Sequence, residues 1–302
     1  MINNGILEQA GSYQHLAVNK IAGALGAEIG GIDLSQPLSD AVFKEVQRAF
    51  AEHQVIFFRG QQITPEQHKA FSLRFGGLLE VPFVRSLEGH PEILAIMKGA
   101  QEITRRNFGG VWHSDMSYAP EPPLGSILCS RVVPPYGGDT LWSNMYLAYE
   151  RLSEGMQRML DPMNVVHSAI RSYGAAGVLV NNGDPASKMD VRTDNRAAAE
   201  VTHPAVRIHP VTGRKALYVN SAYSIRFEDM TEEESKPLLD FLFAHCSRPE
   251  HTCRLRWSPG TIAMWDNRCT QHLAMNDYDG FDRELHRTTI MGDKPIPATP
   301  RP

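Results

Sequence analysis

From Val111 onward, the sequence alternates short apolar runs with turn-forming residues. Turn signals such as Pro210-Val211-Thr212-Gly213 and Ser258-Pro259-Gly260 separate several of these runs. The runs that have the composition of strands cover residues 126–133, 165–167, 205–209, 215–219, 253–257, 261–265 and 287–291. Many short strands with a few helices predict a mainly β fold with helical decoration, of the jelly-roll or double-stranded β-helix type.

Helix signals are few but well defined. Residues 40–53 place Val42, Phe43, Val46 and Phe50 on one helical face. Capping boxes predict two further helix starts, at Thr64 with Gln67 and at Thr231 with Glu234. The second of these helices should run over residues 232–246, and another helix is predicted over 144–152. Short strands are expected at 27–29, 55–58 and 93–97, and residues 1–302 are expected to form a single domain.

Composition excludes several classes of protein. The chain has 302 residues and a net charge of −4, which argues against a nucleic-acid partner, because such proteins usually carry a basic patch. No apolar stretch approaches the roughly 20 residues needed to span a bilayer. The polar N-terminus lacks the apolar core of a signal peptide, and the 4 cysteines show no Cys-x-x-Cys spacing. A cytoplasmic protein is therefore expected.

One segment differs from the rest of the chain. Residues 172–202 are rich in Gly, Ala, Asn and Asp and poor in large apolar side chains. A loop of this length inside a compact domain is usually functional or disordered. We interpret it as a lid over the site, with an insertion that has no role as the alternative.

Three potential metal ligands stand far apart in the sequence. His113-Ser114-Asp115 lies in the first half, and His272 lies far downstream. Two imidazoles and one carboxylate leave half of an octahedral site open, which is typical of non-heme Fe(II) oxygenases. In a strand, His113 and Asp115 would project from the same face.

A His-x-Asp/Glu triplet alone has little weight. With 12 His and 34 acidic residues, roughly one such triplet is expected by chance, and the chain has a second one, His90-x-Glu92. We expect His90 to lie in a loop before the strand at 93–97 and to have no role in metal binding, because Pro91 disfavours regular strand pairing.

Two arginines follow the last potential ligand. Arg283 and Arg287 alternate with Leu285, so in a strand both would face the same side. Two cations inside a β core are costly unless anions accompany them. A bound dicarboxylate would supply these anions; salt bridges to Asp282 or Glu284 are the alternative.

In combination, these motifs resemble the Fe(II)/2-oxoglutarate dioxygenases of the taurine and 2,4-dichlorophenoxyacetate dioxygenase family. The resemblance extends from about Val18 to Pro295. It includes the blocks Trp112-His113-Ser114-Asp115, Gly137-Gly138-Asp139-Thr140, Leu217-Tyr218-Val219-Asn220 and Trp265-Asp266-Asn267-Arg268. It implies a double-stranded β-helix enzyme that needs Fe(II), 2-oxoglutarate and O2.

The resemblance also implies residue roles. His113, Asp115 and His272 would hold the iron and form the catalytic centre. Thr140 and Arg283 would bind the distal carboxylate of 2-oxoglutarate. Arg287 matches an arginine that meets the substrate's sulfonate, near the co-substrate, in taurine dioxygenases. Family members are often oligomers, so a homo-dimer or homo-tetramer is expected by analogy.

The chain departs from taurine dioxygenases where the substrate would bind. Val81 and Val84, after the Phe75-Gly76 turn, replace a histidine and a tyrosine, and Gly109 replaces an asparagine. Without these polar groups, a buried ammonium would have no partners. An apolar wall with Arg287 suits a small anion with a hydrophobic body, such as a sulfonate, a sulfate ester or an aryloxyalkanoate.

Two other functions remain open from the sequence. One is a cupin-type metal oxygenase or isomerase that uses no 2-oxo acid, which would not need Arg283. The other is a non-catalytic ligand-binding β protein with a vestigial metal site.

Overall fold

The computed structural model describes residues 12–102, 107–179 and 186–299. Its largest element is a nine-stranded sheet in the order β1-β2-β3-β15-β7-β17-β6-β5, with β4 also paired to β17. These strands are β1 Ala17–Lys20, β2 Ala27–Gly30, β3 Val55–Phe58, β4 Leu78–Leu79, β5 Ser86–Leu87, β6 His90–Lys98, β7 Gly125–Val132, β15 Ile262–Asp266 and β17 Arg283–Ile290. All pairings except that of β2 with β3 are antiparallel.

A three-stranded antiparallel sheet, β14-β8-β16, shares one apolar core with the large sheet. It is formed by β14 Thr252–Leu255, β8 Thr140–Asn144 and β16 Thr270–Ala274. Phe57 of β3 and Leu128 of β7 meet Trp142 of β8 and Leu255 of β14 in this core. Two sheets packed face to face in this way confirm the predicted jelly-roll architecture.

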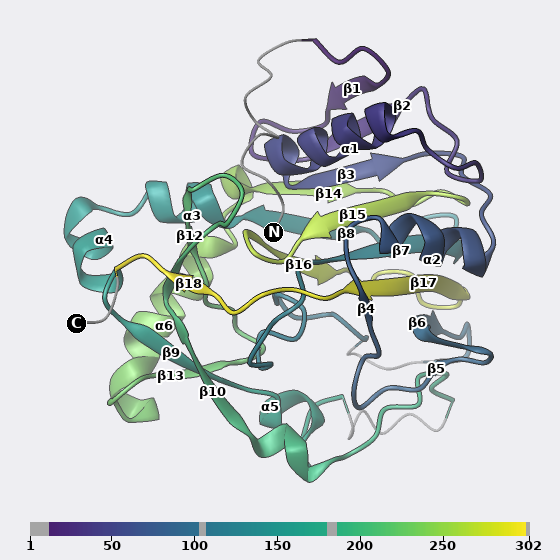
Figure 1. Ribbon diagram of the computed structural model, residues 1–302. Coiled ribbons are helices and arrows are strands. Elements are labelled where there is room, and N and C mark those ends of the chain that lie inside the picture. The colour runs from purple at the N-terminus through teal and green to yellow at the C-terminus, as the bar shows by residue number, and fades with distance from the viewer. Residues whose placement is uncertain (1–11, 103–106, 180–185, 300–302) are drawn as a thin grey trace.

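Two helices cover the other face of the large sheet (Figure 1). They are α1 Asp40–His53 and α2 Pro65–Leu73. Phe43 of α1 and Phe71 of α2 pack in a second core with Ile56 and Phe58, whereas Phe57 faces the first core. Because β3 is covered on both faces, all four of its residues are buried.

The remaining elements form a third layer beside the β14-β8-β16 sheet. Helices α3 Met145–Glu150, α4 Glu154–Leu160 and α6 Glu232–Cys246 enclose an apolar cluster with short strands. The strands are β9 Asn164–Ser168, β10 Glu200–Pro204, β11 Val206–Ile208, β12 Lys215–Leu217, β13 Ser224–Phe227 and β18 Ile296–Pro297. The short helix α5 Ile170–Tyr173 follows β9 directly. No helix in the described ranges is long and apolar enough to cross a membrane.

Most expected elements are present, and a few differ. The helices predicted at 40–53 and 232–246 have those bounds, and both capping boxes form. β17 begins at Arg283 rather than at residue 287 because its residues 283–288 pair with β6. The expected loop at His90 is wrong: His90 is the first residue of β6. His90 pairs with Glu66, at 3.7 Å, and not with a metal cluster.

Candidate functional site

The two histidines come together through their backbones. His113 and His272 form an isolated antiparallel bridge, in which the His113 amide donates to the His272 carbonyl at 3.0 Å and the reverse bond is 2.7 Å. Residues opposite each other in such a bridge have neighbouring side chains, and the imidazole centroids are 4.1 Å apart. β16 holds His272 in place because it pairs along its length with β8.

Asp115 completes the group. One of its oxygens, Oδ1, lies 3.6 Å from His113 Nε2 and 3.9 Å from His272 Nε2. His113 and Asp115 were expected to lie in one strand. In the structure only His113 takes part in a β-bridge, and Asp115 lies in the turn that follows. All three side chains are buried, and their ligand atoms lie within 4.8 Å of one another.

Neighbouring residues fix the orientation of Asp115. Ser126 of β7 donates its hydroxyl to Asp115 Oδ2 at 2.7 Å. The side-chain oxygen of Asn267 accepts the Asp115 amide at 3.2 Å and the indole N–H of Trp265 at 3.0 Å. Ser114 points the other way and donates to the Asn267 carbonyl. Asn267, in the turn after β15, therefore fixes the position of the turn that contains Asp115.

The donor set fits a divalent cation. His113 Nδ1 donates to the Val111 carbonyl at 2.7 Å, which leaves the Nε2 lone pair free toward Asp115. Burial and the neighbouring His113 lower the pKa of His272 well below its ordinary value, so this imidazole stays neutral. Neither Nε2 atom lies within hydrogen-bonding distance of the carboxylate. Two imidazoles and a carboxylate are the ligands that iron of this type requires.

Arg287 is also buried at this point. Its Nη1 donates to Asp115 Oδ1 at 2.8 Å. Burial alone would raise the pKa of Asp115, but the charge of Arg287 holds it well below the ordinary value. The alternative partners are engaged elsewhere, since Asp282 pairs with Lys188 and Glu284 with His286.

Arg283 lies on the same strand but in a separate recess. Its Nη2 donates to the Gly138 carbonyl at 3.0 Å, and its guanidinium lies 5.7 Å from the Tyr278 ring centre. Arg283 is 4% exposed, and burial lowers its pKa. No carboxylate forms an ion pair with it among residues 12–102, 107–179 and 186–299. A buried cation without an anion is costly, so the recess favours an anionic ligand.

Thr140 is the first residue of β8 and is buried. Its Oγ1 accepts the Trp257 indole N–H at 3.0 Å, which leaves its own hydroxyl proton available. Gly138, which binds Arg283, precedes it by two residues. Thr140 and Arg283 are thus connected through this short stretch of chain.

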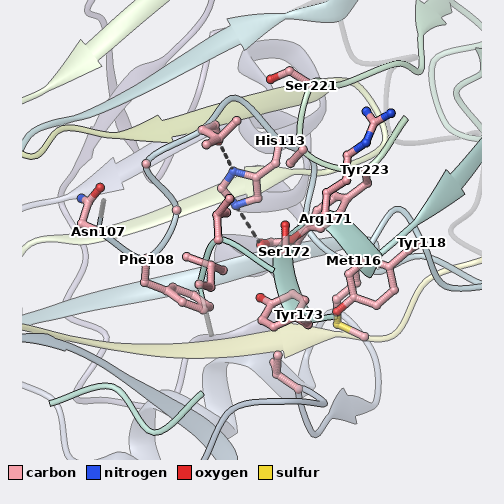
Figure 2. A pocket seen from close by; sticks show the side chains of 18 of the residues that line it. Asn107, Phe108, His113, Met116, Tyr118, Arg171, Ser172, Tyr173, Ser221 and Tyr223 are labelled. Carbon is pink, nitrogen blue, oxygen red and sulfur yellow. Dashed lines mark hydrogen bonds and ion pairs between the residues drawn. The ribbon is translucent and has the colours of Figure 1, made fainter. Parts of the chain in front are cut away.

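A cavity of about 390 Å³ opens onto His113, Asp115 and Arg287. Figure 2 shows His113 between two sides of this cavity, with Asn107 and Phe108 on one side and Tyr118, Tyr223 and Arg171 on the other. Asn107, Phe108 and Leu179 also line the recess of Arg283, so the two spaces adjoin. The remaining wall is mostly apolar and includes Val81, Gly109, Met116, Tyr173, Val178, Leu179 and Ala222.

Not all of the residues expected to contact the substrate line the cavity. Val81 and Gly109 line the cavity, but Val84 does not. Val84 forms an isolated bridge with Val191 and packs in the apolar cluster around Phe83. Gly109 has φ of +79°, which favours glycine, and a Cβ there would touch the His113 ring at 3.5 Å.

A second buried group, His209, Asp266 and Cys269, also has the composition of a metal site. Arg268 binds both Asp266 oxygens, at 2.8 and 2.6 Å, and His209 Nε2 lies 3.0 Å from Oδ2. The other ring nitrogen of His209 accepts two backbone amides. The carboxylate and both imidazole nitrogens are therefore already engaged, and this group is a structural ion pair.

Sequence reasoning missed several residues of the site. Ser126 lies within a strand that was predicted only as an apolar run, and Tyr118, Tyr173 and Tyr223 lie in turns or in a one-turn helix. No periodic pattern marks such positions. Asn267 belongs to the Trp265-Asp266-Asn267-Arg268 block, and the family resemblance of that block implies no role for it.

Comparison with known proteins agrees with this geometry. The model of the taurine catabolism dioxygenase TauD, TfdA family matches residues 17–289. An alpha-ketoglutarate-dependent sulfate ester dioxygenase of Pseudomonas putida is 35% identical, over 98% of this chain and 96% of that protein. An alpha-ketoglutarate-dependent 2,4-dichlorophenoxyacetate dioxygenase of Cupriavidus pinatubonensis is 30% identical, over 92% and 98%.

Solved structures are similar as well. A taurine dioxygenase from Burkholderia xenovorans superposes with a TM-score of 0.78 at 35% identity, covering 94% of this chain and 93% of the other. AAD-2, solved in complex with Mn(II) and N-oxalylglycine, gives a TM-score of 0.75 at 28% identity, over 93% and 99%.

Proposed function

The chain belongs to the taurine catabolism dioxygenase TauD, TfdA family, and we propose that it holds Fe(II) through His113, Asp115 and His272. As a member of this family it is a dioxygenase that depends on Fe(II), 2-oxoglutarate and O2 and acts on a small molecule. Nothing in the comparisons favours a cupin-type enzyme or a non-catalytic binding protein. The observation that carries the iron assignment is the convergence of three buried ligand atoms within 4.8 Å.

Arg283 and Thr140 hold the far carboxylate of 2-oxoglutarate in this proposal. The support is the buried guanidinium with no carboxylate partner among the described residues, in a recess that adjoins the iron cavity. The hydroxyl proton of Thr140 would provide a second donor. An extended dicarboxylate would reach from the iron to the recess, past Asn107 and Phe108, which border both spaces.

The substrate is, in our proposal, an anion with an apolar body. Arg287 lies in the wall of the cavity beside Asp115, which is the only carboxylate in that wall among the described residues. A negative charge on the substrate would therefore meet a cation and no second carboxylate there. The mostly apolar wall of the cavity suits a hydrophobic body.

Sulfonates, sulfate esters and aryloxyalkanoates have this chemistry, and relatives named for such substrates are 30–35% identical to the chain. When bound, Fe(II) with 2-oxoglutarate and O2 supplies the oxidant for a substrate C–H bond. The hydroxylated product either leaves intact or loses its ether or sulfo group. Ser126 and Asn267 hold Asp115 in position, and the apolar wall excludes water around the substrate.

Succinate release tests the proposal directly. The purified protein with Fe(II), ascorbate and 2-oxoglutarate should release succinate when an alkyl sulfate, an alkyl sulfonate or an aryloxyacetate is added. His113→Ala and Asp115→Ala should abolish this release, and full turnover by either variant would refute the ligand assignment. Mixing protein, Fe(II) and 2-oxoglutarate without oxygen should give a weak visible absorption band, which a metal enzyme that binds no 2-oxo acid would not give.

Three further expectations remain proposals. Residues 1–302 act as one dioxygenase domain, and the segment 172–202, of which residues 180–185 lie outside the described residues, serves as a lid. Val178 and Leu179, which line the cavity, support the lid role. A homo-dimer or homo-tetramer in the cytoplasm is the expected state, to be measured by light scattering and by fractionation.

A further inference from the structure

Three tyrosines line the cavity close to the iron ligands. Tyr118 follows Asp115 by three residues, Tyr173 ends α5, and Tyr223 precedes β13. Tyr223 and Tyr118 have ring centres 4.9 Å apart, and Tyr118 and Tyr173 are 6.3 Å apart. Tyr223 also contacts His113, with ring centres 6.3 Å apart. The three rings therefore form one continuous wall that begins at a metal ligand.

The hydroxyls of these tyrosines have few protein partners. Among the residues that the structure describes, none of the three phenol oxygens forms a hydrogen bond with a backbone group or a charged side chain. Tyr173 and Tyr223 interact with each other. None of the three oxygens is among the fully enclosed polar atoms without a partner in the described residues, so they face open space in the cavity, where a ligand can bind them.

The three tyrosines lie at the iron end of the cavity. Tyr223 contacts His113, Tyr118 contacts Tyr223, and Asp115 and Arg287 line the same cavity. A phenol hydroxyl can donate a hydrogen bond without carrying a charge. The group that they face is therefore the part of the substrate next to the oxidised carbon, not the distal end of its body.

Arg287 has only part of its donor capacity left for a substrate. Its Nη1 is bound to Asp115 Oδ1, and the Phe108 ring lies 6.0 Å from its guanidinium carbon. An anion that enters this end of the cavity needs more donors than the remaining face of Arg287 provides. The tyrosine wall offers those donors without adding charge to the site.

We propose that Tyr118, Tyr173 and Tyr223 are specificity-determining residues: the hydroxyls of Tyr118 and Tyr173 donate hydrogen bonds to the oxygens of the substrate's anionic head group, and Tyr223 positions Tyr173 through the contact between them. This inference rests on the proposed function, because it assumes an anionic substrate in this cavity. The head group lies against the two donating phenols and the free face of Arg287, and the apolar body extends toward Val81, Val178 and Leu179.

Phenylalanine substitutions test this inference, because they remove each hydroxyl and keep the ring. We expect Tyr118→Phe, Tyr173→Phe and Tyr223→Phe each to raise the KM for the anion about tenfold or more, since hydrogen bonds to charged groups are strong. The affinity for 2-oxoglutarate and the anaerobic absorption band should not change. Succinate formed per product should rise, because a poorly held substrate is oxidised less efficiently.

Controls separate the hydroxyl from the ring and from the fold. Tyr136→Phe alters a tyrosine that is 58% exposed and does not line the cavity, and it should match the wild type. Tyr173→Leu tests the contribution of the aromatic ring, and thermal unfolding tests the stability of each variant. If the phenylalanine variants keep the wild-type KM while Tyr173→Leu raises it, the inference is overturned, because the tyrosines would then contribute only through the packing of their rings. If no sulfate ester, sulfonate or carboxylate elicits succinate, the proposed substrate class itself is wrong and the inference falls with it.

Discussion

Replacing Arg287 by glutamine should reveal how the site behaves without its metal. Arg287 and Asp115 form an ion pair at 2.8 Å in which both side chains are 4% exposed. Removing one partner of a buried pair leaves an uncompensated charge and usually costs about 3–5 kcal/mol. For a chain of this size, that cost should lower the Tm of the metal-free protein by roughly 10 °C.

Metal binding should reverse most of this loss. A divalent cation at His113, Asp115 and His272 would compensate the Asp115 carboxylate that Arg287→Gln leaves unpaired. Metal should therefore raise the Tm of the variant more than that of the wild type. The extra rise should be close to the Tm difference between the two metal-free proteins. Zn(II) suits this measurement because it has no redox chemistry.

The assay compares thermal unfolding with EDTA and with excess Zn(II) for both proteins. Arg158→Gln serves as the control, because the side chains of Arg158 and Glu154 are 73% and 90% exposed and such pairs contribute little. A metal-free Arg287→Gln protein that unfolds within 2 °C of the wild type would refute the reasoning. So would a variant whose deficit remains unchanged when metal is added.

Three further predictions follow from individual contacts. Arg283→Gln should raise the apparent Kd for 2-oxoglutarate at least tenfold in anaerobic titrations, because the recess loses its buried cation, and an unchanged Kd would mean that another residue binds the distal carboxylate. Ser126→Ala should weaken metal binding about tenfold or more in competition with a chelator while leaving Kd for 2-oxoglutarate nearly unchanged, because Asp115 Oδ2 loses the donor that orients it. Burial lowers the pKa of His167 to about 3, so the unfolded chain takes up a proton below pH 6.5 that the folded chain does not, and stability should fall as pH decreases through the window from 6.5 to 3. His167→Gln should reduce the loss between pH 7.5 and 5.5 by about 1 kcal/mol in denaturant unfolding, and an unaltered pH dependence would contradict this.

Local signals in the sequence were sufficient for several parts of the fold. The helix over Asp40–His53 has an apolar face that only a 3.6-residue period explains, and the Thr231 capping box fixes the start of α6. Residues 55–58 are β-branched or aromatic throughout, which predicted a strand, and the structure covers this strand on both faces. Each of these signals is contained within a short stretch of chain.

Features that depend on long-range pairing were not predictable in the same way. β16 and β8 carry polar residues such as Thr270, Gln271 and Ser143, which become buried only because the two strands pair and are covered. The sequence suggested a strand through Asp115, but that residue lies in a turn held by Asn267, which is more than 150 residues away. Tertiary contacts of this kind override local propensity.

The candidate site was predictable in its ligands and less so in its walls. Metal ligation needs particular side-chain chemistry, so His113, Asp115 and His272 were recognisable as a set. The substrate wall needs only apolar or aromatic surface, which many residues supply. Val84 was expected in that wall but packs behind it, and Tyr118 and Tyr223 were not expected there at all.

Iron binding by the His272→Ala variant tests the central claim most directly. Anaerobic titration of the metal-free wild type with Fe(II) should show one tight site per chain. The substitution removes the ligand that the His113 bridge brings into the site, so it should weaken that site by two orders of magnitude or more without changing the fold. An His272→Ala protein that binds Fe(II) as tightly as the wild type would contradict the account.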